Sequence, residues 1–166
     1  MEGEEKPQTD ATSEFAEPEN VRNPLPANLV AGIERVVIGE LDPATKDGEI
    51  RVIETISDAY RVEHLKRHLT TPMLSKRSRQ RSSGRAYQLL FIDRGGHVVA
   101  GANFSPEPAF GFALQLSKYG YERDGRYFGG GGDAVLPGDW KPDINYSQYI
   151  IPFRDWIECV GYSPGV

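Results

Sequence analysis

Residues 86–104 read AYQLLFIDRGGHVVAGANF and carry the strongest structural signal in the chain. Two apolar runs flank the cluster Asp93–Gly96, whose glycines can adopt the positive φ angles of a tight turn. The stretch therefore predicts a β-hairpin at the centre of a globular core.

The register of this hairpin depends on its turn. A two-residue loop at Gly95-Gly96 would pair Phe91 with Ala100, Leu89 with Ala102 and Tyr87 with Phe104 on one face. The other face would pair Ile92 with Val99, Leu90 with Gly101 and Gln88 with Asn103. Both faces are apolar, so the two strands are expected inside a sheet. A four-residue turn over Asp93–Gly96 is the alternative.

The segment before this hairpin predicts a second hairpin and a helix. Ile33–Leu41 and Ile50–Ile56 are rich in β-branched residues and flank turn-forming residues, so they predict paired strands. Ser57 or Asp58 can cap a helix over Ala59–Leu69. Its buried stripe would contain Val62, Leu65 and Leu69.

The segment after the central hairpin predicts further strands. Ser105–Pro108 is expected to end the hairpin strand, and residues 110–116 then alternate between large apolar and other side chains. Asp124-Gly125 predicts another hairpin turn. Gly129–Gly132 favours a surface loop over a phosphate-binding loop, because no Lys-Ser/Thr pair follows it.

The last part of the chain predicts a strand over Ile144–Ile151 and then a short helix that begins at Pro152. The apolar stripe of this helix would consist of Phe153, Trp156, Ile157 and Val160. Gly161 is placed to end it.

The predicted fold class is α+β, with a mostly antiparallel sheet of about five to seven strands built from hairpins. One helix follows the first hairpin and a short helix lies at the C-terminus. Residues 1–24 are acidic and poor in large apolar side chains, which predicts a disordered tail. Residues 25–166 are expected to form a single α+β domain.

Composition favours a soluble, cytoplasmic protein, unless the chain is part of a longer one. No apolar run is long enough to span a membrane, the N-terminus does not resemble a secretory signal, and Cys159 is the single cysteine. Cys159 lies between predicted core positions and beside acidic residues, so its thiol is expected to be inert. His97, beside the hairpin turn, is expected to be exposed.

The basic segment Arg61–Arg85 is the main electrostatic feature. It holds eight cationic residues and one acidic residue, Glu63. These candidate anion- or partner-binding residues are Arg61, Lys66, Arg67, Lys76, Arg77, Arg79, Arg81 and Arg85. Clustered cations attract polyanions, but the segment contains no aromatic residue that could stack on bases. A solvated loop is therefore favoured over a nucleic-acid site.

His64 and His68 are four residues apart on the predicted helix, a spacing that can hold a divalent metal. The motif HLKRH lacks an acidic residue beside the first histidine, and Arg61, Lys66 and Arg67 would repel a cation. A solvated basic helix face is therefore favoured over a metal site, and no metal or cofactor is predicted. Paired carboxylates such as Asp155 with Glu158 cannot be distinguished from surface charges.

An aromatic group gives the last candidate site. Its members could line a groove for a partner or pack the edge of the sheet: Tyr119, Tyr121, Tyr127, Phe128 and Trp140.

The favoured function is a non-enzymatic binding or accessory domain that recognises a protein partner. The alternatives are polyanion or nucleic-acid binding through the basic segment, and a small enzyme or ligand-binding domain whose site residues converge only in the folded state. The sequence leaves the oligomeric state open.

Overall fold

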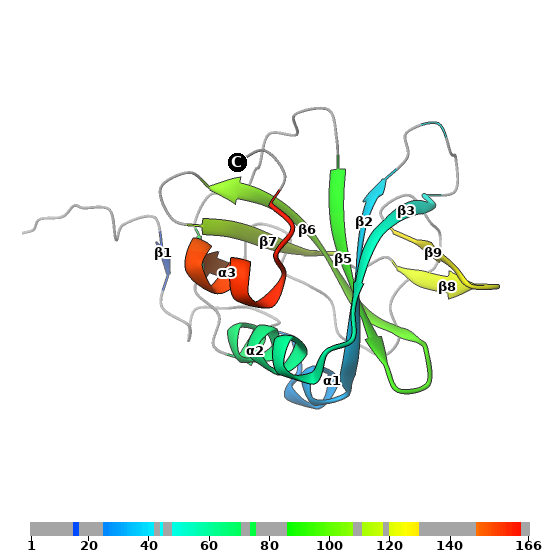
Figure 1. Cartoon of the computed structure of the whole chain (residues 1–166), viewed down its shortest axis with the longest axis horizontal. Helices are drawn as coiled ribbons and strands as arrows, with labels where there is room; N and C mark the ends of the chain where they lie inside the picture. Colours follow the sequence, from blue (N-terminus) through cyan, green and yellow to red (C-terminus); the bar gives the residue numbers. More distant parts are fainter. Residues whose placement is uncertain are drawn as a thin grey trace, which may run out of the picture.

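The computed structural model describes residues 15–16, 25–41, 44, 48–70, 74–75, 86–107, 111–117, 120–129 and 149–163. Within these residues, a six-stranded antiparallel sheet carries helices on one face (Figure 1). The predicted α+β class, with a mostly antiparallel sheet, a helix after the first hairpin and a short C-terminal helix, is confirmed.

The main sheet has the strand order β10-β7-β6-β5-β2-β3. Its strands are β2 (Ile33–Leu41), β3 (Ile50–Ile56), β5 (Ala86–Asp93), β6 (Val98–Glu107), β7 (Gly111–Ser117) and β10 (Tyr149–Pro152). The helices are α1 (Ala27–Ala31), α2 (Ala59–Thr70) and α3 (Phe153–Cys159). Two short pairs accompany the sheet: β1 (Phe15–Ala16) with β4 (Leu74–Ser75), and β8 (Tyr121–Arg123) with β9 (Arg126–Phe128).

The central hairpin, β5 and β6, lies in the interior of the sheet as predicted. Its expected pairs hold away from the turn: Phe91 with Ala100, Leu89 with Ala102, Tyr87 with Phe104, Leu90 with Gly101 and Gln88 with Asn103. Near the turn the prediction was wrong, because Ile92 pairs with Val98 rather than Val99. The amide of Asp93 donates to the carbonyl of His97, and Gly96 adopts a φ of 87°. The turn is therefore longer than two residues, and a bulge restores the predicted register beyond it.

The expected break at Ser105–Pro108 is also wrong. β6 continues to Glu107, and Pro106 pairs with Phe112 on β7. Proline has no amide hydrogen and removes one ladder bond, but its fixed φ is compatible with an extended strand.

The first hairpin, β2 and β3, matches the predicted residue ranges. Its register shifts between Ile38 and Gly39, which pair with Glu54 and Val52. Ile53 is thus an extra residue in β3, which forms one edge of the main sheet.

Local sequence signals account for α2. Its first turn is capped by the Asp58 carboxylate, which accepts a hydrogen bond from the Arg61 amide at 3.1 Å. The predicted stripe of Val62, Leu65 and Leu69 is buried against the sheet. The sequence pattern did not predict α1, a single short helix after Pro26.

α3 begins at Phe153, one residue after the predicted start at Pro152, and it exposes one residue of the predicted stripe. Trp156 is fully buried and stacks on Phe112, with ring centroids 4.3 Å apart. Ile157 is 64% exposed, and Cys159 is buried in its place. This short helix contacts the sheet on a narrow face, so residue 157 lies on the outer side.

The face of the sheet opposite the helices meets the β8–β9 hairpin at its β3 side (Figure 1). The Asp124-Gly125 turn has the two positive φ angles that the sequence predicts, 54° and 79°. Glu49 bridges to Phe128 and forms an ion pair with Arg126. These contacts fix the hairpin against β3.

Several predicted segments lie outside the described residues, including residues 76–84, 130–143 and 144–148 and most of the acidic tail. Among the described helices, none has the length and apolarity needed to cross a membrane.

Candidate metal centre

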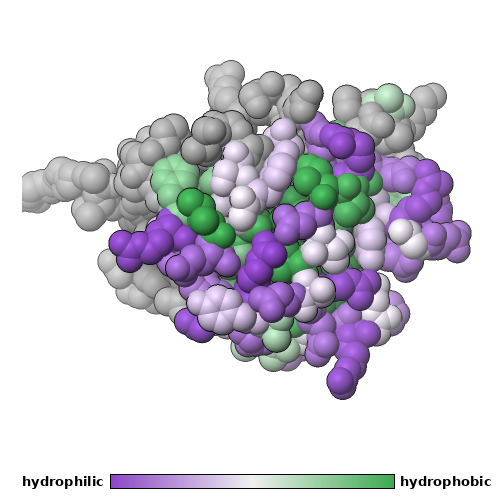
Figure 2. All heavy atoms as spheres, in the orientation of Figure 1, coloured by the Kyte–Doolittle hydropathy of each residue, from purple (hydrophilic) through white to green (hydrophobic). Residues whose placement is uncertain are grey.

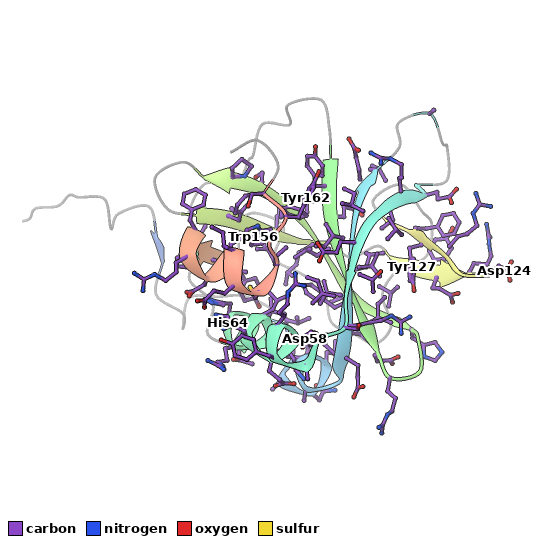
Figure 3. The ribbon with its side chains drawn as sticks, viewed as in Figure 1. Asp58, His64, Asp124, Tyr127, Trp156 and Tyr162 are labelled. Atoms are coloured by element: carbon purple, nitrogen blue, oxygen red, sulfur yellow. The ribbon has the colours of Figure 1, made fainter. Side chains whose placement is uncertain are left out.

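The two histidines of α2 lie on one side of the helix. His64 and His68 are one turn apart, and their ring centroids are 5.8 Å apart. The buried stripe of α2 faces the sheet, and His64 lies beside this stripe, on the side that meets α3 (Figure 3). His68 lies on the same side, because it also approaches Asp155 of α3. Their side chains are only 13% and 22% exposed, so they are not on a fully solvated face.

α3 supplies two carboxylates to the same place. Asp155 Oδ1 lies 3.7 Å from His64 Nε2, and Asp155 Oδ2 lies 3.4 Å from His68 Nε2. Glu158 Oε1 lies 4.0 Å from His64 Nε2. Because Trp156 and Cys159 are anchored in the core, the helix turns these two acidic residues toward α2.

The spacing of these atoms fits a metal ion. One ligand atom each from His64, His68 and Asp155 can be chosen so that all lie within 4.8 Å of one another. Around a tetrahedral zinc ion with ligands at about 2.0–2.1 Å, neighbouring ligand atoms are roughly 3.3–3.4 Å apart. The His68–Asp155 distance of 3.4 Å matches this value, and the His64–Asp155 distance of 3.7 Å, to the other carboxylate oxygen, is slightly longer. The side chains must therefore adjust for one ion to contact both imidazoles and the carboxylate.

The protonation of His68 also suits metal ligation. The pKa of His68 is lowered, chiefly because the imidazole is partly buried. The Asp155 carboxylate opposes this shift, whereas His64 and Arg67 add to it. A neutral imidazole is the form that binds a metal.

The cations that were expected to repel a metal are mostly engaged elsewhere. Arg61 donates to the carbonyls of Cys159 and Val160 and pairs with Glu54. Lys66 donates to the carbonyls of Ala31 and Ile33 and pairs with Glu63. Of these three cations, Arg67 is the one whose charge contributes to lowering the pKa of His68. The predicted repulsion is therefore weaker than the sequence suggests.

The same contacts bear on the candidate anion site. Arg61 and Lys66 connect elements of the fold, so binding a polyanion would have to replace these contacts. Arg67 is exposed on α2, and the remaining five members lie outside the described residues: Lys76, Arg77, Arg79, Arg81 and Arg85.

The aromatic candidates pack mainly against the protein. Phe128 is buried and stacks on Tyr121, with centroids 4.6 Å apart, and the Arg123 guanidinium lies over both rings. The hydroxyl of Tyr127 accepts a hydrogen bond from Arg35 at 3.1 Å. Tyr119 and Trp140 lie outside the described residues.

Two other sequence candidates follow expectation. Burial, followed by the nearby Asp155 carboxylate, raises the pKa of the Cys159 thiol to about 12. His97 is exposed and lies 3.5 Å from the Asp93 carboxylate within the hairpin turn.

Sequence reasoning missed the carboxylate partners of the histidines. Asp155 and Glu158 are three positions apart on a predicted helix, which places them on one face. That signal was present, but nothing in the sequence said that this face would meet α2.

Comparison with known proteins gives no further assignment, since no protein-family model, curated protein or solved structure matches the chain. Fold and site together define an α+β domain with a two-histidine, one-carboxylate cluster between two helices.

Proposed function

We propose that this protein is a non-enzymatic domain that binds a divalent transition metal through His64, His68 and Asp155. The observation that supports this function is the convergence of three ligand atoms, from two helices, within 4.8 Å. Imidazole ligands suit zinc, copper, nickel or iron better than magnesium or calcium. Zinc is commonly bound by histidine and aspartate ligands and is the first ion to test.

Calorimetric titration of the full chain with zinc at pH 7.5, after treatment with a chelator, tests the proposal. We expect one ion per chain. Each of the variants His64→Ala, His68→Ala and Asp155→Asn should weaken binding at least about tenfold. His97→Ala is the matched control, because this imidazole is 81% exposed in a distant turn. Unchanged affinity in all three ligand variants, or no zinc binding by the wild type, would overturn the proposal.

A protein partner is the second candidate function, and exposed apolar side chains on the helices favour it. Tyr60 on α2 and Ile157 on α3 are 62% and 64% exposed. Figure 2 shows the helix-bearing face, where hydrophobic atoms reach the surface among hydrophilic ones. A single partner surface across α2 and α3 would use both residues.

The partner hypothesis predicts a specific loss in an affinity capture experiment. Nuclease-treated lysate should yield a partner that binds the wild type and is lost with Tyr60→Ser/Ile157→Ser. Capture should also change little with salt, because an apolar contact is insensitive to screening. Equal capture by both proteins contradicts this surface, and steep salt dependence would favour the alternative function, polyanion binding.

A further inference from the structure

Glu158 is the acidic residue of the cluster that the three-ligand set does not use. It lies one helical turn after Asp155 on α3, and its Oε1 is 4.0 Å from His64 Nε2. Its side chain is 51% exposed, whereas that of Asp155 is 31% exposed. An exposed glutamate side chain has several rotatable bonds, so its carboxylate can move from this position toward an ion held by the other three residues.

The fourth position decides what kind of metal site this is. Structural zinc sites have four protein ligands, whereas catalytic sites have three and keep one position for water or substrate. Two neutral imidazoles and two carboxylates would also balance the charge of a divalent ion. The ligands come from the facing sides of two packed helices, a geometry suited to joining them.

We infer that Glu158 is the fourth ligand and that the metal forms a closed structural link between α2 and α3. This inference rests on the proposed metal binding at His64, His68 and Asp155. The competing arrangement leaves water in the fourth position, with Glu158 beside it as a base, which would be an open site capable of hydrolysis.

Cobalt(II) is a suitable probe, because its visible spectrum reports coordination number and exchangeable ligands. Wild-type protein loaded with cobalt should show the intense bands of four-coordinate geometry, and azide should leave them unchanged. Glu158→Gln should bind cobalt at least about tenfold more weakly. Its spectrum should then shift with azide, because the fourth position becomes open.

Controls separate this inference from the proposed function. Glu63→Gln removes a carboxylate from α2 that pairs with Lys66, and should leave cobalt affinity and spectrum unchanged. Glu158→Asp keeps the carboxylate but shortens its reach, and should give an intermediate affinity. An azide-sensitive wild-type spectrum, or wild-type cobalt affinity in Glu158→Gln, would overturn the fourth ligand while the three-ligand site stands. Failure of the wild type to bind cobalt or zinc would instead overturn the metal function itself.

Discussion

Nη2 of Arg61 lies 2.5 Å from the carbonyl oxygen of Val160, 99 residues later in the chain. Nε of the same guanidinium donates to the Cys159 carbonyl at 3.2 Å. The last carbonyls of a helix lack partners within it, and a cation there also complements the helix dipole. The first turn of α2 thereby closes the C-terminal end of α3.

Arg61→Met is expected to destabilise the protein by about 1.5–3 kcal/mol, because hydrogen bonds to a partly buried charge are lost. Urea unfolding measures the change. Arg67→Met is the matched control on the same helix, since Arg67 is exposed, and should shift stability by no more than about 0.5 kcal/mol. Equal effects of the two variants would show that the hydrogen bonds from Arg61 to the α3 carbonyls do not stabilise the fold.

Zinc is expected to raise the free energy of unfolding, because the ligands meet only in the folded chain. At a free zinc concentration of 100 times the Kd, the increase should be about 2.7 kcal/mol. Thermal unfolding with zinc, and again after EDTA, measures it. Asp155→Asn should respond much less than the wild type, and a full response in that variant would place the bound metal elsewhere.

Gly129→Ala is expected to cost about 1–3 kcal/mol by overpacking. A Cβ at this position would lie 1.7 Å from Oε1 of Gln88, which is 2% exposed and donates through Nε2 to Asn103 at 2.7 Å. The amide cannot move aside without losing that bond. Denaturant unfolding measures the loss.

Two comparisons test this explanation of Gly129. Gly32→Ala should be close to neutral, because its new Cβ would make only ordinary contacts at 3.6 Å. Gln88→Ala combined with Gly129→Ala should cost less than the sum of the single changes, since the clash disappears. Simple additivity would mean that Gln88 is not the obstacle.

Cys159 is expected to resist alkylation in the folded protein. With a pKa of about 12, roughly one thiol in ten thousand is ionised at pH 8. Its reaction with iodoacetamide should be at least about a thousandfold slower than in urea, where the thiol regains an ordinary pKa. Mass spectrometry follows the modification, and equal rates in both states would contradict the buried thiol.

The same shift fixes the sign of the pH effect on stability. The folded protein holds the Cys159 proton more tightly than the unfolded chain does. The contribution of this thiol to the free energy of unfolding is therefore complete below the ordinary thiol pKa of 9.0. It is lost as the pH rises from there toward about 12.

Patterns of apolar residues predicted most of the sheet, because side-chain alternation and turn residues act locally. The ranges of β2 and β3 and the inner pairs of the central hairpin followed from them. Ile157 and Pro106 were placed wrongly, because the narrow contact face of α3 and the pairing of β7 are set by tertiary packing. Asp155 joined the histidines for a similar reason: only the packing of α3 on α2 brings them together.

The extra residue Ile53 forms a bulge in β3, at one edge of the main sheet, and this bulge affects how the edge can pair. β3 carries the half-exposed Val52. An exposed edge strand without a bulge is a template for uncontrolled pairing with other chains. A bulge bends its strand and increases the local twist, so the outward peptide groups no longer form an even row. The bulge therefore makes the β3 edge a poorer template for pairing with a strand of another chain, which is the first step of fibrous aggregation.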